Sequence, residues 1–374
     1  MRIGIDARPL IGKNMAGIST YLHNILLWLA ENDKENEYLL YSWSEFEVER
    51  DYGPNFHFRL VKPTRGFLWN VIDIPLALLR DKVKVFWGPT HELPRRVPGV
   101  RSVLTVHDLA LILNPAWGNA HNAKVMNKHM PKAAKRADQI LADSRSTKED
   151  LIRVCGTDGD KISVVYLGGV PDRSDLVSPE ALAAAKEKYG IKDKFFYFVG
   201  TIEPRKNIET AIRAFNLVAE KDPDVQLILA GGLGWSYGGI LQAMELSPYT
   251  DRIKHIGYVS LDEKMNLYAA SQAFLFPSHY EGFGIPVLEA MRLGSIVITA
   301  NNSSLPEVGG DAALYVDDEN DATALATLME QVLAMESIER QERIRLGIAQ
   351  TEKFSWEQCA RETAQVLTGK ELSV

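Results

Sequence analysis

The chain has 374 residues, of which 46% are hydrophobic and 24% are charged, so it is a globular protein longer than one typical domain. A formal net charge of −7 argues against a general nucleic-acid binder, whose surface would be basic. The two cysteines, Cys155 and Cys359, lie far apart, which predicts neither a disulfide framework nor a cysteine metal site.

The N-terminal stretch MRIGIDARPLIG lacks a long apolar core and predicts a first strand rather than a signal peptide. The longest apolar stretch, Phe67–Leu79, is interrupted by Asn70, Asp73 and Pro75 and is too short and polar to span a bilayer. We therefore expect a cytoplasmic protein.

Strand-like and helix-like segments alternate along the chain, which predicts an α/β fold with mainly parallel sheets. The predicted strands of the first half are 2–6, 38–43, 56–61, 83–87, 102–106, 139–142 and 162–166, with a helix over 17–31. The polar stretch 171–179 lacks periodicity and predicts a linker. The second half has predicted strands over 195–199, 225–230, 253–256, 273–276 and 296–299, and predicted helices over 207–220, 262–270, 323–333 and 356–367.

This pattern predicts two Rossmann-like domains. The first comprises residues 1–170 and the second residues 171–352, and a C-terminal helix within 353–374 is expected to pack back on the first domain. Two α/β halves of similar size predict a cleft between them, which is the usual place for a ligand.

The stretch from Ser278 to Glu289 combines a strand end, a glycine-containing turn and a short helix with Pro286 in its first turn. Backbone N–H groups and the positive end of a helix dipole at one place suit a phosphate. Glu281 and Glu289 flank this place, and carboxylates beside a phosphate more plausibly bind hydroxyls. A ligand with phosphates and hydroxyls at both ends is a nucleotide sugar.

Arg205 and Lys206 follow the first predicted strand of the second half and lie next to a helix start. Arginine can bind two phosphate oxygens at once, and lysine adds a mobile point charge. The pair therefore predicts a diphosphate clamp rather than two surface cations.

Four further strand ends carry candidate residues. Gly12–Ile18 is a glycine turn after the first strand, which allows a phosphate or simply forms an ordinary turn. His107 and Asp108 end an apolar strand, where a histidine binds a sugar hydroxyl, assists proton movement or makes one structural hydrogen bond. Gly231-Gly232 and the stretch ending at Val259 would let a nucleobase approach the backbone, although each alone is only a turn.

The stretch 119–136 carries a stripe of basic residues interrupted by Pro131. A basic face of this kind rests on anionic lipid headgroups or, more commonly, is simply solvated. The residues are Lys124, Lys128, Lys132, Lys135 and Arg136.

Together these motifs resemble the large retaining glycosyltransferase family that has a GT-B fold, with two Rossmann-like α/β domains facing a central cleft, and an E-x7-E motif. The resemblance covers nearly the whole chain, and Glu281 and Glu289 reproduce the spacing. Its motifs are EPRKN at 203–207, AGG at 230–232, HYEGFGIPVLEAM at 279–291, NNSSLPEVGGDAAL at 301–314, TVHDL at 105–109 and the turn at Gly17.

The resemblance implies transfer of a sugar from a nucleotide diphosphate donor to a hydroxyl of a glycan or lipid-linked acceptor, with retention at the anomeric carbon. Glu281 resembles the carboxylate near the donor sugar, and Glu289 the residue that binds the ribose diol. Arg205 and Lys206 resemble the cations that neutralise the leaving diphosphate. His107 resembles the histidine of the first domain that faces the transferred sugar.

Backbone positions are implied as well. Gly282, Phe283 and Gly284 resemble the pocket for the sugar and phosphates, and Gly17 resembles the glycine that lets the diphosphate approach. Gly232 and Val259 complete the expected donor-binding set.

The chain departs from the family at two places. Many relatives have arginine where this chain has Thr201, and an Arg-Tyr pair where it has Thr20-Tyr21. Phosphate neutralisation is therefore expected to depend more on Arg205 and Lys206. The sequence shows no cluster of Asp or His with metal-ligand spacing, so no metal or other cofactor is expected.

The resemblance favours mannose from GDP-mannose over UDP-sugars, acceptors that are surface glycans, and a location in the cytoplasm or on the inner face of the membrane. Two alternatives stay open: a nucleotide-sugar hydrolase or epimerase on the same fold, and a non-catalytic nucleotide-sugar-binding subunit. A nicotinamide dehydrogenase is poorly supported because no GxGxxG follows a predicted strand.

Overall fold

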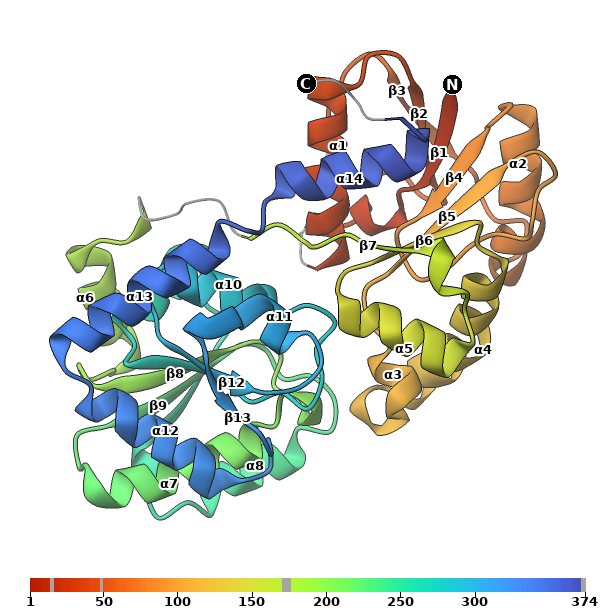
Figure 1. The fold of residues 1–374 in the computed structure, drawn as a ribbon. Coiled ribbons are helices and arrows are strands. Elements are labelled where there is room, and N and C mark those ends of the chain that lie inside the picture. Colours follow the sequence, from red (N-terminus) through yellow and green to blue (C-terminus); the bar gives the residue numbers. More distant parts are fainter. Residues whose placement is uncertain (14–16, 48–49, 170–175, 371–374) are drawn as a thin grey trace. The chain divides into compact units, whose positions relative to one another are not determined.

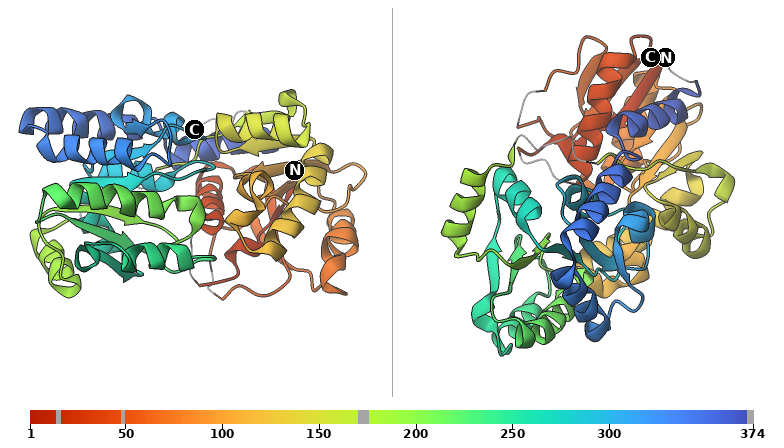
Figure 2. Two further views of the ribbon diagram at one scale, coloured as in Figure 1. Left: turned by 90° about the horizontal axis from the view of Figure 1, so that it is seen from below. Right: turned by 60° about the vertical axis from the view of Figure 1, so that its left-hand side comes forward.

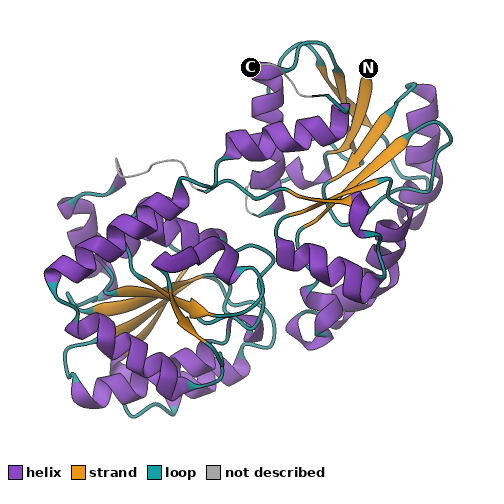
Figure 3. Cartoon of the chain, viewed as in Figure 1, coloured by secondary structure: helices purple, strands orange, loops and turns teal. Residues whose placement is uncertain are grey.

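The computed structural model describes residues 1–13, 17–47, 50–169 and 176–370. The chain divides into two compact units. The first unit comprises residues 1–112, 123–168 and 354–374, and the second comprises 113–122 and 169–353. Parallel strands form the inner layer of each unit and helices cover them, as Figure 3 shows by colour.

The first unit is built on a seven-stranded sheet of order β3-β2-β1-β4-β5-β6-β7, and every pairing between its strands is parallel. The order reverses between β1 and β4, and such a switch point opens a crevice at the carboxyl ends of the strands. The strands are β1 (Arg2–Asp6), β2 (Glu37–Ser42), β3 (Phe56–Leu60), β4 (Val85–Gly88), β5 (Arg101–Val106), β6 (Gln139–Ala142) and β7 (Ile162–Val164).

Helices cover this sheet on both faces. The C-terminal helix α14 packs beside α1, and Figures 1 and 2 show the two next to each other in blue and red. Arg101 fixes the end of α14 by donating to the carbonyl of Leu367 at 2.7 Å. The helices are α1 (Ile18–Asn32), α2 (Ile74–Arg80), α3 (Ala110–Leu113), α4 (Ala120–Arg136), α5 (Arg145–Cys155) and α14 (Trp356–Thr368).

The second unit is built on a six-stranded sheet of order β10-β9-β8-β11-β12-β13, also parallel throughout. Its strands β9, β11 and β12 are fully buried, as expected where helices cover both faces of a sheet. The order reverses between β8 and β11. The strands are β8 (Phe195–Val199), β9 (Gln226–Ala230), β10 (Ile253–Gly257), β11 (Ala273–Phe276), β12 (Val297–Ala300) and β13 (Leu314–Val316).

Figure 1 shows α7, α8 and α12 on one face of the second sheet and α10, α11 and α13 on the other. Buried aromatic side chains of β8, β11 and α9 contact one another in the core of this unit. They include Tyr197, Phe274 and Tyr268. The helices are α6 (Pro179–Tyr189), α7 (Ile208–Lys221), α8 (Gly238–Glu245), α9 (Leu261–Ala270), α10 (Ile285–Arg292), α11 (Leu305–Gly309), α12 (Ala322–Ala334) and α13 (Ser337–Thr351).

Three features of the division of the chain and of helix α4 differ from the expectations. The division of the chain falls after residue 168 rather than 170, and the segment Leu113–Asn122 groups with the second unit. The expected interruption at Pro131 is wrong, because α4 continues through it from Ala120 to Arg136. Buried Met130, Ala133 and Ala134 pack this part of the helix, which offsets the hydrogen bond that proline removes. Most of the predicted linker, residues 170–175, lies outside the described residues.

Candidate active site

The turn between β11 and α10 sits at the switch point of the second sheet. Its last residue, Gly284, has φ 111° and ψ 44°, a left-handed conformation that side chains disfavour. A Cβ there would lie 3.3 Å from Leu305. Pro286 occupies the first turn of α10, where N–H groups have no partner inside the helix. The turn therefore brings the N-terminal end of α10 to the switch point of the sheet.

Three residues after β12 hold this turn in place. The backbone N–H of Glu281 donates to Ser303 Oγ at 3.0 Å. The Ser304 hydroxyl lies 3.0 Å from the carbonyl oxygen of Glu281 and 2.7 Å from that of Phe283. Asn302 donates to the carbonyl of Ser278 at 3.1 Å. These contacts are made inside the protein, so the conformation of the turn does not depend on a ligand.

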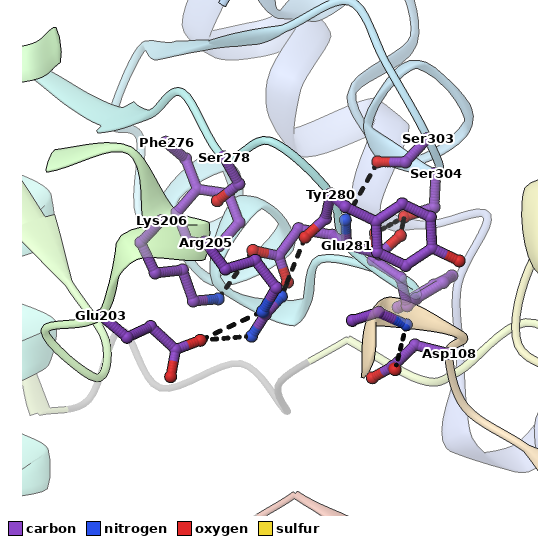
Figure 4. A network of polar contacts seen from close by, with 12 residues as sticks. Asp108, Glu203, Arg205, Lys206, Phe276, Ser278, Tyr280, Glu281, Ser303 and Ser304 are labelled. Atoms are coloured by element: carbon purple, nitrogen blue, oxygen red, sulfur yellow. Dashed lines mark hydrogen bonds and ion pairs between the residues drawn. The ribbon is translucent and has the colours of Figure 1, made fainter. Parts of the chain in front are cut away.

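Glu281 pairs with both predicted phosphate cations, as Figure 4 shows. Lys206 Nζ lies 2.7 Å from Glu281 Oε1, and Arg205 Nη1 lies 2.8 Å from Oε2. Arg205 also contacts Glu203 at 2.8 Å and donates to the carbonyl of Tyr280 at 2.9 Å. The cluster thus holds two cations and two carboxylates, and its formal charges cancel.

Burial and charge act against each other in this cluster. Burial alone would raise the pKa of Glu281, but Arg205 and Lys206 outweigh it and lower that pKa to about 2. Burial lowers the pKa of Lys206, although Glu281 opposes the shift. Lys206 also lies 4.7 Å above the ring of Phe276, a favourable cation–π position. Glu281 is therefore ionised at neutral pH.

Glu289 occupies α10 and is held by two partners from α9. Lys264 Nζ lies 2.7 Å from Glu289 Oε1, and the Tyr268 hydroxyl lies 3.0 Å from Oε2. Glu281 and Glu289 thus belong to separate networks. The two carboxylates are not arranged as one acid/base pair.

Glycines at the ends of β8, β9 and β10 approach one another closely. Gly231, with φ 128°, donates to the carbonyl of Gly257 at 2.7 Å, and a Cβ on it would lie 1.9 Å from the carbonyl oxygen of Gly200. Only glycine permits this approach. Gly232 is exposed and has open space around its Cα, whereas Val259 is buried.

The remaining predicted residues, His107 and Gly17, lie in the first unit. His107 Nδ1 lies 2.7 Å from Asp143 Oδ2, and Nε2 lies 2.9 Å from the carbonyl oxygen of Pro89. A carbonyl only accepts, so Nε2 carries a proton, and a second proton lies between Nδ1 and Asp143. Gly17, with φ 55°, precedes the first residue of α1. Residues 14–16 of the predicted glycine turn lie outside the described residues.

Burial and the neighbours of His107 shift its pKa in opposite directions. Burial alone would lower the pKa of His107, but the charge and hydrogen bond of Asp143 raise it. Burial also raises the pKa of Asp143, so the pair retains its proton. The neighbouring His91, whose ring is 5.2 Å from that of His107, has its pKa lowered to about 4 by burial and by His107. His91 is thus kept neutral, whereas His107 shares a proton with Asp143.

Trp117 belongs to the segment that groups with the second unit and lies beside the Glu281 turn. Its ring stacks on His279 with centroids 6.0 Å apart and on Tyr280 with centroids 6.2 Å apart. Its carbonyl accepts a hydrogen bond from the indole of Trp235. No sequence pattern marked this contact, because it joins residues far apart in the chain.

Several other residues of the site were not predicted from the sequence, although some of them carried a usable signal. Glu203 lay inside the EPRKN motif, so its charge was visible although its pairing with Arg205 was not. Lys264 and Tyr268 are four residues apart on α9, which places them on one helix face. The serines that hold the turn follow β12, and polar residues after a buried strand were a usable signal.

The predicted basic stripe is present on α4 and exposed at Lys124, Lys128, Lys132 and Lys135. Within the described ranges, no helix is long and apolar enough to cross a membrane. The same residues contain no group of three His, Cys, Asp or Glu side chains positioned to hold a metal ion.

Comparison with known proteins agrees with this architecture. The family model "Glycosyltransferase Family 4" matches residues 15–173, and "Glycosyl transferases group 1" matches residues 183–350. O-antigen chain mannosyltransferase B of Escherichia coli is 34% identical over 76% of this chain and 74% of its own length.

Solved structures show the same fold. WaaG, a glycosyltransferase involved in lipopolysaccharide biosynthesis, superposes with a TM-score of 0.73 at 16% identity over 99% of this chain and 100% of its own. HepE from Anabaena, determined in complex with UDP-glucose, gives a TM-score of 0.72 at 16% identity over 99% of both chains. The predicted GT-B fold is confirmed. The chain belongs to the glycosyltransferase family that the models "Glycosyltransferase Family 4" and "Glycosyl transferases group 1" describe, and it is a transferase enzyme.

Proposed function

We propose that this enzyme transfers mannose from GDP-mannose to a hydroxyl of a glycan or lipid-linked acceptor, with retention at the anomeric carbon and without a metal ion. The mannosyl group is supported by the similarity to O-antigen chain mannosyltransferase B. A nucleotide sugar as donor is supported by the fold shared with HepE, which was determined with UDP-glucose.

The observation that carries the proposal is the pairing of Arg205 and Lys206 with Glu281 at the switch point of the second sheet. Cations that are largely shielded from water are costly to maintain without partners. Here Arg205 and Lys206 share Glu281, and Arg205 also pairs with Glu203. A diphosphate bound at the turn would offer both cations more negative charge than Glu281 does. The donor sugar would then lie beside a carboxylate released from part of its pairing.

The catalytic step is departure of the nucleoside diphosphate while the acceptor hydroxyl attacks from the same face. The leaving phosphate oxygen accepts the hydroxyl proton, so no protein base is needed. Negative charge grows on the diphosphate in the transition state, and Arg205, Lys206 and the first turn of α10 are fixed before the reaction begins. Such preorganised charge stabilises the transition state more than the bound donor.

The other residues have binding roles in the proposal. Glu289 binds the ribose diol through lone pairs that Lys264 and Tyr268 leave available. The backbone of Gly282, Phe283 and Gly284 lines the sugar and phosphate pocket, with Gly232 and Val259 near the base.

Two residues of the first unit complete the proposed donor-binding set. Gly17 admits the diphosphate to the backbone. His107, whose ring nitrogens are both hydrogen-bonded, would face the transferred sugar without accepting the proton of the acceptor hydroxyl.

The cellular setting is part of the proposal. The acceptor belongs to a cell-surface polysaccharide, as for the relatives, and the enzyme works in the cytoplasm. The exposed lysines of α4 would contact anionic lipids of the inner membrane face.

The test is the substitution of Lys206 by alanine. Removing one fixed donor to developing charge typically lowers kcat by about 10²–10³-fold, and we expect that loss in transfer of mannose from GDP-mannose. Lys221→Ala removes a lysine of an exposed ion pair with Glu330 in the same unit and should leave kcat unchanged.

Near-normal transfer by folded Lys206→Ala would contradict the role. The anomeric configuration of the product, read by NMR, tests retention. Activity abolished by a chelator and restored by a divalent metal would contradict metal independence.

A further inference from the structure

A second group of polar and aromatic residues lies at the switch point of the first sheet. Asp6 ends β1, Trp43 follows β2, and Glu92 follows β4. Because β1 lies between β2 and β4, the carboxyl ends of these three strands meet at one edge of the sheet. In open α/β sheets this edge is where ligands bind.

A buried ion pair forms the base of this group. Arg8 Nε lies 2.8 Å from Asp6 Oδ1 and Nη2 lies 2.5 Å from Oδ2, and Asp6 is only 2% exposed. The same Nη2 lies 2.9 Å from Glu92, which also accepts from Asn70 at 3.0 Å. Burial works against the charge of Arg8, but Asp6 and Glu92 raise its pKa. Two carboxylates share one guanidinium, so the group carries one net negative charge.

Two tryptophans enclose the guanidinium. Arg8 Cζ lies 4.8 Å from the ring centroid of Trp43 and 4.4 Å from that of Trp69. Trp69 is buried, and its indole donates to the carbonyl of Val61 at 2.8 Å. Trp43 keeps 42% of its surface exposed although Arg8 covers one of its faces. A single exposed tryptophan needs no explanation, but this one packs on the guanidinium of a buried ion pair at a ligand-binding edge.

We propose that this group, Trp43 with Glu92 and Asn70, is a subsite for an uncharged sugar unit of the acceptor glycan. The exposed ring of Trp43 packs against the C–H face of the sugar, and hydroxyls donate to the Glu92 carboxylate and the Asn70 amide oxygen. Rigid aromatic rings offer contact area at a low entropy cost. The proposal rests on the proposed function, because it takes the acceptor to be a glycan.

The negative charge of the group favours the sugar part of an acceptor over its phosphate part. A lipid-linked acceptor carries phosphate as well as sugar, and phosphate is repelled by the net negative charge of Asp6, Arg8 and Glu92. The subsite therefore takes the glycan part of the acceptor. The bond to be formed is unaffected, since these residues position the sugar and do not touch the reacting atoms.

The experiment compares Trp43→Ala with wild type, using mannotriose as the neutral probe and inorganic pyrophosphate as the charged one. NMR titration without donor should show a response of the Trp43 indole to mannotriose and none to pyrophosphate. In transfer assays, Trp43→Ala and Glu92→Gln should raise the acceptor KM by tenfold or more and leave the donor KM unchanged. Trp43→Phe should recover part of the loss.

Trp28→Ala is the matched control. Trp28 is a partly exposed tryptophan near the C-terminal end of α1, away from the carboxyl ends of the strands, and its loss should leave both KM values unchanged. An unchanged acceptor KM in folded Trp43→Ala, or a titration that responds only to pyrophosphate, would overturn the proposal. If wild-type protein transfers from no nucleotide sugar, the proposed function fails, and the mannotriose titration still decides the subsite.

Discussion

At the scale of single residues, Glu281 is the group on which the charge of the second unit's site depends. One carboxylate contacts both Arg205 and Lys206, and all three side chains are largely shielded from water. Removing one partner from such a buried network leaves uncompensated charge, which typically costs about 3–5 kcal/mol. The same carboxylate therefore contributes to stability before it meets any donor.

Acid should reveal this contribution. The pKa of Glu281 is about 2 in the folded protein and about 4.3 when unfolded, which corresponds to about 3 kcal/mol at neutral pH. Because the pKa of Glu281 is lower in the folded protein than in the unfolded chain, its ionisation stabilises the folded protein at every pH above the unfolded pKa. This stabilisation is lost as the pH falls from the unfolded pKa toward the folded pKa. We expect the difference in the free energy of unfolding between wild type and Glu281→Gln to shrink by about 2 kcal/mol when the pH is lowered from 6 to 3.

Hydrogen exchange in increasing urea, read on peptides of β8 and β11, measures the free energy of unfolding for this unit alone. Glu330→Gln, which removes the carboxylate of the exposed pair with Lys221, should show no such convergence with wild type. A gap between wild type and Glu281→Gln that stays constant with pH would show that the carboxylate is not ionised as the geometry indicates.

Residue types at strand ends could be predicted from the sequence, but their pairing could not. Arg205, Lys206 and Glu281 each follow a buried strand, so their convergence was expected. Their direct ion pairs were not, because the direction of a side chain in a short turn depends on the fold. Arg8 and Trp43 were missed for the same reason, although each also follows a strand. Asn70 lies in a π-helical turn, which has no usable sequence signal.

At the scale of elements, the β11–α10 turn fixes the site residues relative to the second sheet. Gly284 adopts its left-handed conformation because the chain must reverse before α10 starts, and Ser304 holds the carbonyls of Glu281 and Phe283, which precede it. A side chain at Gly284 would strain the backbone by about 1–3 kcal/mol and would meet Leu305. The turn thus has little freedom to accept substitution.

We expect Gly284→Ala to lower the free energy of unfolding of the second unit by about 1–3 kcal/mol and to weaken donor binding. Thermal unfolding and calorimetric titration with GDP measure the two effects. Gly238→Ala is the control, since Gly238 begins α8 with open space around its Cα and should be neutral or slightly stabilised. Equal stability of the two variants would contradict the strain at Gly284.

Buried parallel strands were the elements best predicted from sequence. The run AFLF of β11 is wholly apolar because both faces of the strand are covered, so its bounds were predicted correctly. β13 has only three residues and gave no signal. The basic helix α4 continues through Pro131 because its packing outweighs the local preference of proline. Long-range packing of this kind, as also for Leu113–Asn122, is invisible to local patterns.

At the scale of the whole molecule, each unit has its own sheet, helices and core. A ligand that binds only the folded form of one unit stabilises that unit by RT ln(1 + [L]/Kd), which is about 2.7 kcal/mol at 100 times Kd. The proposed donor residues that contact the nucleotide most directly, Arg205, Lys206 and Glu289, all belong to the second unit. Nucleotide binding should therefore be visible as a difference between units.

We expect saturating GDP to slow hydrogen exchange in peptides of β8, β9 and β11, and to leave β2 and β3 unchanged. GDP should protect more than UDP at the same concentration if the donor base is guanine. Lys206→Ala should lose most of this protection because the cation meets the diphosphate, whereas Lys221→Ala should keep it. Protection confined to the first unit would place the nucleotide elsewhere, and greater protection by UDP would reassign the base while leaving the diphosphate contacts of Arg205 and Lys206 intact.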